Sequence, residues 1–292
     1  MNNDFKTIVI YLLTLFVIVL LIVLKRQQNH MELIKEEYRV YNHEKARQEK
    51  EVAALLQDSI ATLEEKKLGK VKGVIGLIID DFGYRNDNIS KRFLSLPGNL
   101  TYAVIPGHEH SKRFSQQAVV SGYEIIIHMP MENIGKTYGE EEYVLMTSFS
   151  KDEIWNRIDK AFLSIPEATG LNNHQGSKAS ASYPLMKIIA ENLKGKNKFF
   201  IDSRTASNSV GMSTMKEYGV PTNQRNIFLD NDLDEELIFN QLMKLVRLSE
   251  KRGAAIGIGH VKLQTLSVLE KNIPDLINKG FKFEFVSKMV NE

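Results

Sequence analysis

Val74–Gly83 reads VIGLIIDDFG. Its apolar part, Val74–Ile79, is too continuous for a strand with one solvated face, along which apolar and polar residues would alternate. We therefore expect a strand buried on both faces, as in a parallel sheet covered by helices. Asp80 and Asp81 follow at once, so this strand carries two carboxylates at its end. Because neighbouring residues of an extended strand point to opposite faces, we expect the turn at Phe82–Gly83 to rotate one of them.

Short apolar runs and longer helical patterns alternate over the rest of the chain. The expected strands are Val74–Ile79, Leu100–Ile105, Glu124–Ile127, Gly170–Leu171, Lys198–Ile201, Ile227–Leu229, Ala255–Ile258 and Phe281–Phe285. The expected helices are Asn88–Leu96, Ser111–Ser121, Lys151–Ile165, Tyr183–Leu193, Met212–Tyr218, Asp234–Lys251 and Thr265–Lys279. This order predicts an α/β fold with a parallel sheet. For residues 72–292 we expect a single domain, a seven- or eight-stranded (β/α) barrel, with a doubly wound sheet as the alternative.

Residues 1–71 differ in composition from the rest of the chain. Thr7–Leu24 is an uncharged apolar run of 18 residues, about 27 Å long as a helix, which is enough to cross a bilayer. We predict an uncleaved transmembrane helix as an anchor in residues 1–25, rather than a signal peptide or a buried core helix, because no small-residue cleavage site follows. Residues 26–71 are charged, with sparse apolar residues at helical spacing, and predict a helical stalk; a self-associating coiled coil is the alternative.

Composition excludes several classes of function. The 38 Lys and Arg residues nearly balance the 36 Asp and Glu residues, and the net charge of +2 argues against a nucleic-acid partner. The chain has no cysteine, which excludes thiolate zinc sites and cysteine nucleophiles. Metal sites built from His, Asp and Glu remain open.

Polar side chains gather where the expected strands end. In chain order they are Asp80 and Asp81, His128, Asn172, Asn173 and His174, Asp202, Asp230 and His260. The carboxyl ends of parallel strands share one face, so we expect these residues to meet there. Imidazole and carboxylate suit a divalent metal such as zinc, with a free carboxylate as proton acceptor and a histidine as proton donor. We expect His108 and His110, in the loop after the second strand, to be capping or surface residues.

Five segments resemble motifs of the divergent polysaccharide deacetylase family, a branch of the NodB-like superfamily related to carbohydrate esterase family 4. They are IIDDFG at Ile78–Gly83, HMPME at His128–Glu132, GLNNHQGS at Gly170–Ser177, FFIDSRT at Phe199–Thr205 and IGIGH at Ile256–His260. The resemblance implies a distorted α/β barrel that hydrolyses the N-acetyl amide bonds of amino-sugar polymers with a divalent metal, for which we expect zinc. It also implies Asp80 as general base, Asp81 and His128 as metal ligands, and His260 as general acid.

One motif departs from the pattern of the superfamily. The superfamily has H-x-x-x-H in its second motif, whereas this chain has His128 and Glu132 at those positions. We expect His174 to complete the metal site, with Glu132 as the alternative ligand. The remaining motif residues are expected to support the site or contact substrate: Glu132, Asn172, Asn173, Asp202 and Arg204. We expect Asp202 to orient a metal ligand or the acid, and Arg204 to hold that Asp or the substrate.

Two functions from different classes follow. The leading hypothesis is a metal-dependent hydrolase that removes N-acetyl groups from envelope polysaccharide, anchored by a single span in the cytoplasmic (inner) membrane. The alternative is a non-catalytic metal- or glycan-binding scaffold domain at the cell envelope. A metal phosphohydrolase is disfavoured because Arg204 is the one basic residue in the motifs that carry the expected ligands. We expect the domain outside the cytoplasm, although Lys25, Arg26, Lys35 and Arg39 after the span favour the reverse orientation.

Overall fold

The structure is a computed structural model that describes residues 24–28, 31–32, 35, 39, 44–47, 50–52, 71–135 and 140–291. The predicted span lies almost wholly outside these residues, as does most of the predicted stalk. Within the described residues, no helix is both long enough and apolar enough to cross a membrane. The described residues from Val71 onward belong to one compact unit, Lys70–Glu292.

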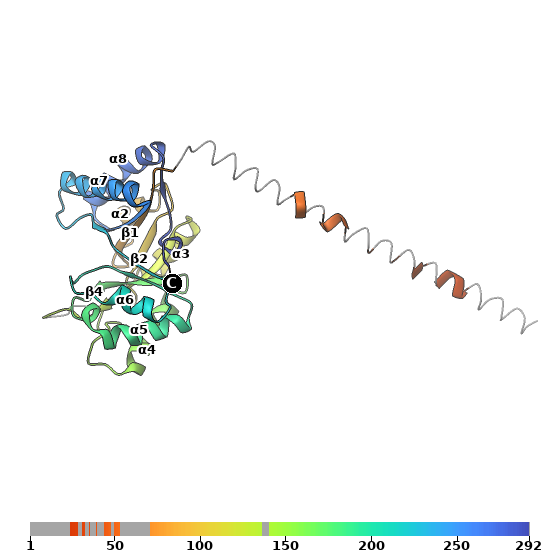
Figure 1. Cartoon of the computed structure of the whole chain (residues 1–292), viewed down its shortest axis with the longest axis horizontal. Coiled ribbons are helices and arrows are strands. Elements are labelled where there is room, and N and C mark those ends of the chain that lie inside the picture. The colour runs from red at the N-terminus through yellow and green to blue at the C-terminus, as the bar shows by residue number, and fades with distance from the viewer. Residues whose placement is uncertain are drawn as a thin grey trace, which may run out of the picture. The chain divides into compact units, whose positions relative to one another are not determined.

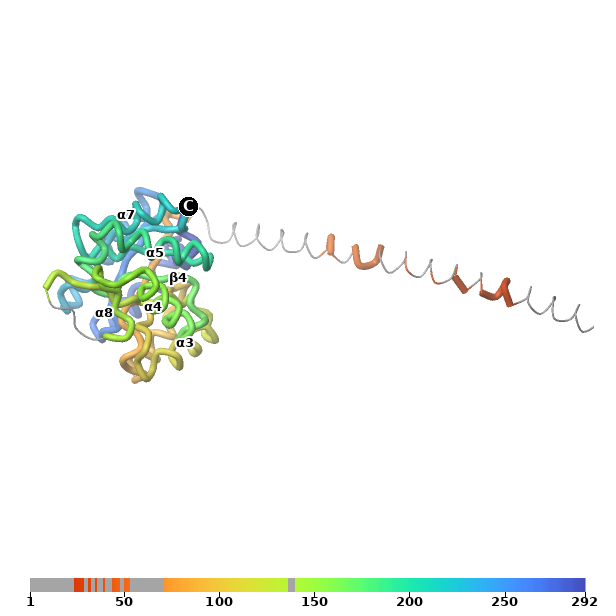
Figure 2. Tube along the Cα trace, turned by 90° about the horizontal axis from the view of Figure 1, so that it is seen from below, coloured from red at the N-terminus to blue at the C-terminus, as the bar shows by residue number. Residues whose placement is uncertain are grey.

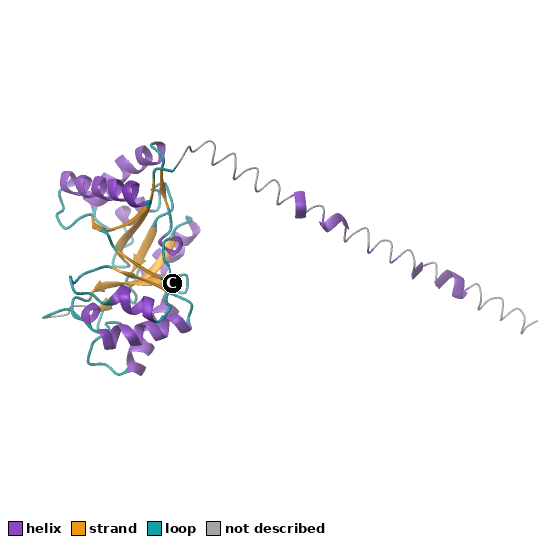
Figure 3. Ribbon diagram, in the orientation of Figure 1, coloured by secondary structure: helices purple, strands orange, loops and turns teal. Residues whose placement is uncertain are grey.

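This unit is an α/β fold in which strands and helices alternate (Figures 1 and 3). The strands are β1 (Gly73–Phe82), β2 (Thr101–Val104), β3 (Glu124–Met131), β4 (Gly170–Gln175), β5 (Phe199–Asp202), β6 (Thr222–Gln224), β7 (Ile227–Phe228), β8 (Ala254–His260) and β9 (Phe281–Phe283). The helices are α2 (Asn88–Phe93), α3 (Ser111–Val120), α4 (Lys151–Ser164), α5 (Tyr183–Gly195), α6 (Gly211–Glu217), α7 (Glu235–Arg252) and α8 (Leu263–Asn278), with short 3-10 turns η1 (Ala179–Ala181) and η2 (Val286–Lys288). Figure 3 shows the strands between two groups of helices, and Figure 2 gives the view from below.

The nine strands form one parallel sheet that curls into a half-barrel. Its order is β6-β5-β4-β3-β2-β1-β8-β7, and β9 pairs with the first residues of β1. Within residues 71–135 and 140–291, no ladder joins the end strands β6 and β7. The chain itself crosses this opening, because the Arg225 N–H donates to Asp202 O of β5 and the Asn226 N–H donates to Ile256 O of β8. The barrel therefore curls round without being closed by strand pairing.

The predicted α/β fold with a parallel sheet is confirmed, and each expected element has a counterpart within a few residues. The expected seven or eight strands and the barrel need correction, because the half-barrel has nine strands and an open seam. The strand missing from the prediction is β6. Its residues, Thr222, Asn223 and Gln224, are polar and give no apolar run, yet their backbone pairs with β5.

Side chains of the strands alternate between two cores. The larger core lies between the sheet and the helices and includes Leu77 and Ile79 of β1. The smaller core fills the barrel interior and consists of Ile78, Ala103, Ile126, Phe199, Ile201, Ile256, Ile258 and Val286. Strands buried on both faces explain the continuous apolar runs. The interior core also forms the floor beneath the residues at the carboxyl ends of the strands.

Candidate metal and catalytic site

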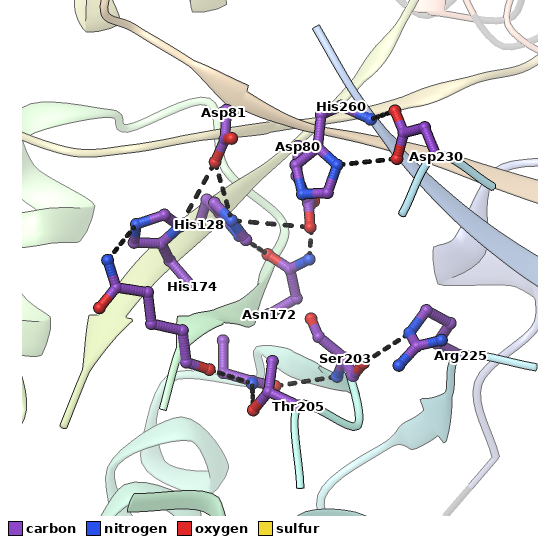
Figure 4. Close-up of polar contacts among 12 residues, drawn as sticks. Asp80, Asp81, His128, Asn172, His174, Ser203, Thr205, Arg225, Asp230 and His260 are labelled. Atoms are coloured by element: carbon purple, nitrogen blue, oxygen red, sulfur yellow. Dashed lines mark hydrogen bonds and ion pairs between the residues drawn. The ribbon is translucent and has the colours of Figure 1, made fainter. Parts of the chain in front are cut away.

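The alternation along each strand continues past the interior core and determines which polar side chains face the mouth of the barrel. A residue two positions beyond an interior apolar residue faces the interior again. The residues so placed are Asp80 after Ile78 in β1, His128 after Ile126 in β3, Ser203 after Ile201 in β5, and His260 after Ile258 in β8. Asp80 and His260 are register partners in the paired strands β1 and β8. Figure 4 shows Asp80, His128 and His260 gathered around Asn172 of β4.

The backbone conformation of Asp81 breaks the alternation and turns its side chain toward the mouth. Its φ is +70°, in the left-handed region, and the register between β1 and β2 shifts between Ile79 and Phe82. Aspartate tolerates this region better than most residues other than glycine. The expected rotation of one carboxylate therefore occurs, but at Asp81 itself rather than at Phe82–Gly83. The two adjacent carboxylates consequently have different surroundings.

Asp81, His128 and His174 bring three potential metal ligands together. Asp81 Oδ1 lies 3.4 Å from His128 Nε2 and 3.3 Å from His174 Nδ1. Ligand atoms about 2.0–2.1 Å from a tetrahedral zinc ion lie roughly 3.3 Å apart, so this spacing fits such an ion. Asp81 Oδ1 is buried and accepts no hydrogen bond of good geometry. An uncompensated carboxylate oxygen facing two imidazole nitrogens is the arrangement that a cation would satisfy.

Asp81, His128 and His174 are called the metal cluster below. Asn172 connects this cluster to the carboxylate of Asp80. Its Nδ2 donates to Asp80 Oδ1 at 2.9 Å, and its Oδ1 accepts from His128 Nδ1 at 2.7 Å. The opposite amide orientation would turn the Oδ1 atom toward a carboxylate, so the proton of neutral His128 lies on Nδ1. The lone pair on His128 Nε2 then points toward Asp81 and is free to bind a metal. The sequence predicted that Asn172 supports the site or contacts substrate, but not that it bonds both Asp80 and His128.

Electrostatics separate the two aspartates. Burial raises the pKa of Asp80, which is 2% exposed, and the neighbouring His128 only partly offsets this. Burial also disfavours the charged form of Asp81, but the nitrogens of His128 and His174 hold its pKa far below the usual range. Asp81 is therefore suited to bind a cation, and Asp80 to accept a proton.

Hydrogen bonds to Asp230 hold His260 at the end of β8, beside Asp80 of β1. Its Nδ1 lies 2.9 Å from Asp230 Oδ1, while Asp230 Oδ2 accepts from the His260 backbone N–H and from Thr265 Oγ1. Burial alone would lower the pKa of His260, but the hydrogen bond to Asp230 raises it to about 9. His260 is thus protonated at neutral pH and could protonate a leaving group.

Glu132, the alternative third ligand, is not part of the cluster. One of its oxygens accepts from Lys178 Nζ at 2.7 Å, and the other accepts from the backbone and hydroxyl of Thr147 at 2.7 and 2.6 Å. The geometry therefore favours His174 as the ligand that replaces the second histidine of the motif.

Asn173 and Asp202 lie on the opposite side of their strands from the mouth. Asn173 Oδ1 accepts from the Ser203 N–H, and Asp202 accepts from the Arg204 N–H and Ser209 Oγ. These bonds order the loop between β5 and α6. Among the described residues, Asp202 and the side chain of Arg204 contact neither His260 nor the metal cluster, so the expected positioning of a ligand or the acid needs correction. Arg204 donates instead to Gln224 Oε1 and Ser207 O.

The two histidines of the H-x-H pair lie outside the metal cluster. His110 is the N-cap residue of α3, although its side chain makes no capping hydrogen bond. His108 Nε2 lies 3.0 Å from Glu140 Oε1, which also accepts from the Tyr84 hydroxyl at 2.6 Å.

A pocket between the loop after β1 and the segment after β8 reaches Asp81. Its volume is about 430 Å³, and Asp81 forms part of its wall. Tyr84 and Arg85 from the loop after β1, and Lys262 and Leu263 after β8, also line it. The arrangement as a whole can hold a divalent cation, accept a proton at Asp80 and donate one at His260.

Known proteins resemble this chain in sequence and in fold. A model of the divergent polysaccharide deacetylase family matches residues 77–290. The uncharacterized protein YibQ of Escherichia coli (strain K12) is 34% identical over 204 residues, 70% of this chain and 63% of YibQ, so the chain spans less than two thirds of that relative. An uncharacterized protein of Haemophilus influenzae (strain ATCC 51907 / DSM 11121 / KW20 / Rd) is 33% identical over 204 residues, 69% of this chain and 72% of its own.

The crystal structure of the uncharacterized protein ATU2773 from Agrobacterium tumefaciens C58 has the same fold. Its TM-score is 0.72 at 20% identity, and the match covers 76% of this chain and 91% of ATU2773. The family model spans most of the half-barrel and contains the five motifs from β1 to β8. The chain therefore belongs to the divergent polysaccharide deacetylase family.

Proposed function

We propose that this protein is a metal-dependent hydrolase that removes N-acetyl groups from an amino-sugar polysaccharide of the cell envelope. The observation that carries the proposal is the position of Asp80. This residue is bonded through Asn172 to the metal cluster, and His260 lies beside it on the neighbouring strand. Cation ligands, a proton acceptor and a proton donor thus surround one point at the barrel mouth.

The residues have distinct tasks in this reaction. Asp81, His128 and His174 would hold the metal, most suitably zinc, which when bound supplies Lewis acidity to polarise the amide carbonyl and acidify the attacking water. Asp80 accepts the proton of that water as its oxygen attacks the carbonyl carbon. His260 then donates its proton to the amide nitrogen as the C–N bond breaks. The products are acetate and a sugar with a free amine.

A non-catalytic scaffold is the competing function, and it rests on the changed second motif. That argument weakens because His174 supplies an imidazole nitrogen 3.3 Å from Asp81 Oδ1. Acetate release by the purified full-length protein from N-acetylated glycans distinguishes the two functions.

Replacing a metal ligand should remove the metal without unfolding the protein. Full-length protein reconstituted with zinc and dialysed should retain about one ion per chain, whereas His128→Ala and His174→Ala should retain almost none, because each removes one of three ligands. His110→Ala is the matched control, and Glu132→Gln tests the alternative ligand; both should keep the ion. Elemental analysis measures the metal, and circular dichroism the fold. Stoichiometric zinc in both ligand variants would contradict the assignment.

The proton-transfer residues should be needed for turnover but not for the metal. Asp80→Asn and His260→Ala should lower kcat by a factor on the order of 10² to 10⁴, the usual loss when a general base or acid is removed. Zinc content should stay at the wild-type value, because neither side chain belongs to the ligand cluster. Full acetate release by Asp80→Asn would refute its role as base.

The pH profile should respond to Asp230. His260 loses its proton as pH rises through about 9, so kcat should fall there. In Asp230→Asn the negative partner is gone, the pKa of His260 should drop toward its ordinary value of about 6.5, and the alkaline limb should move to lower pH. The exposed Asp232→Asn is the control. Superimposable alkaline limbs for wild type and Asp230→Asn would argue against His260 as the acid.

The envelope location is part of the proposal, because such a glycan lies outside the cytoplasmic membrane. We expect residues 1–25 to anchor the protein with its N-terminus inside and the domain outside. Alkaline phosphatase fused after Glu292 should be active in a bacterial host, while a reporter that works only in the cytoplasm should be silent at the same position. The reverse pair of results would place the domain in the cytoplasm and eliminate the envelope substrate.

A further inference from the structure

Two arginines at the barrel mouth are held in place by neutral oxygens. The Arg225 side chain donates from Nε to Ser203 O at 2.6 Å and from Nη2 to Arg204 O at 2.8 Å, and it stacks on the ring of Phe228. The Arg204 side chain donates to Gln224 Oε1 and to Ser207 O, both at 3.2 Å. Both side chains are half-buried. Their guanidinium groups are therefore ordered while their charge is retained.

Within residues 71–135 and 140–291, no carboxylate forms an ion pair with Arg204 or Arg225. Among the described residues, no carboxylate oxygen lies within 4.0 Å of either guanidinium group. Asp202 and Asp80 attract Arg225 at longer range, but burial and the charge of Arg204 still lower the pKa of Arg225. The Asp202 carboxylate is already occupied by the Arg204 N–H and Ser209 Oγ. Keeping a half-buried cation without a partner costs free energy, which an anionic ligand would recover.

Arg225 lies on the side of the mouth that carries Asp80 rather than on a remote surface. Asp80 is close enough to act on the pKa of Arg225. Figure 4 shows Arg225 across Asn172 from His174, joined to the loop that carries Ser203 and Thr205. The Ser203 side chain is on the interior face, and its hydroxyl is buried with no hydrogen-bond partner in the part of the chain that the structure describes. The barrel mouth that holds Asp80 therefore also holds a buried hydroxyl, that of Ser203, and a cation without an ion-pair partner among the described residues, Arg225.

We propose that Arg225, assisted by Arg204, binds an oxyanion of the substrate, so that the protein acts on an acidic amino-sugar polymer. This inference rests on the proposed deacetylase function. The oxyanion is a carboxylate or phosphate carried by a sugar near the acetamide, because a fixed guanidinium group with free N–H donors matches either group. The alternative role for Arg225, adjusting the pKa of Asp80, does not explain why the arginine is held there. Arg225 makes no contact with Asp80 within 4.0 Å, and Asn172 already bonds that carboxylate.

The test compares three N-acetylated oligosaccharides of equal length: one neutral, one with carboxylates and one with phosphates on the sugars. Full-length wild-type protein should give a lower KM for an anionic substrate than for the neutral one, and added salt should reduce the difference. Preference for carboxylate or for phosphate identifies the source of the oxyanion. Equal KM values for all three substrates would overturn the proposal.

Substitution of the arginines should reduce this discrimination. Arg225→Gln should raise KM for the anionic substrate roughly 10-fold to 100-fold, the range for loss of a hydrogen bond to a charged group. Arg225→Lys should restore little, because the planar fork is lost. Arg204→Gln is a second variant, which we expect to disturb the structure less than Arg225→Gln does. Arg247→Gln, on the exposed face of α7, is the control. Wild-type discrimination in both Arg225→Gln and Arg204→Gln would refute the assignment.

A binding measurement separates this inference from the catalytic proposal. If no oligosaccharide releases acetate, the same three are titrated into zinc-free protein by calorimetry. Tighter binding of an anionic oligosaccharide that Arg225→Gln abolishes would support the oxyanion site while the deacetylase function fails. Acetate release without any anion preference would leave the deacetylase and eliminate the oxyanion site.

Discussion

The alternation of side chains along parallel strands is the constraint on which the site depends. Each strand must bury one set of side chains under the helices and the other in the barrel interior, because both faces of the sheet are covered. The interior set ends in Ile78, Ile126, Ile201 and Ile258, and two residues later the same face presents Asp80, His128, Ser203 and His260. The same alternation that places apolar side chains in the interior core thus places polar side chains at the mouth. A one-residue shift in register would turn these groups toward the helices and leave Asn173 and Asp202 in their place.

Asp81 shows what is gained by breaking this alternation once. With ordinary extended backbone its carboxylate would point away from His128, and the site would hold one aspartate instead of two. The left-handed backbone at φ +70° brings it back to the mouth, at a conformational cost on the order of 1 kcal/mol or more. The pKa values of the neighbouring carboxyl groups then shift in opposite directions, because Asp81 faces two imidazoles whereas Asp80 is buried and bonded to an amide. One aspartate is suited to a cation and the other to a proton.

Much of this arrangement could be predicted from sequence, and the limits have physical causes. Apolar runs identify strands only where side chains are buried. The polar strand β6 was therefore not predicted, whereas the other strands were. Strand ends identified Asp80, His128 and His260, and counting in twos from Ile201 would have placed Asp202 on the helix side. The role of Asn172 required knowing that β3 and β4 are adjacent and in register. Arg225 follows the unpredicted β6, so no pattern pointed to it.

The altered second motif leaves the second imidazole beside Asp81 to be supplied by a neighbouring strand. In the structure, β3 and β4 pair so that His174 is the register partner of Pro130, two residues beyond His128 on the neighbouring strand. From there the His174 imidazole places Nδ1 3.3 Å from Asp81 Oδ1. Glu132 is then free to bond Lys178 and Thr147, which ties that loop to the segment following β4. Proline at position 130 is tolerated because β3 has already passed the end of β2, where a backbone donor would be needed. Spatial adjacency of strands, rather than spacing within a motif, therefore decides whether the donor set for a cation is complete.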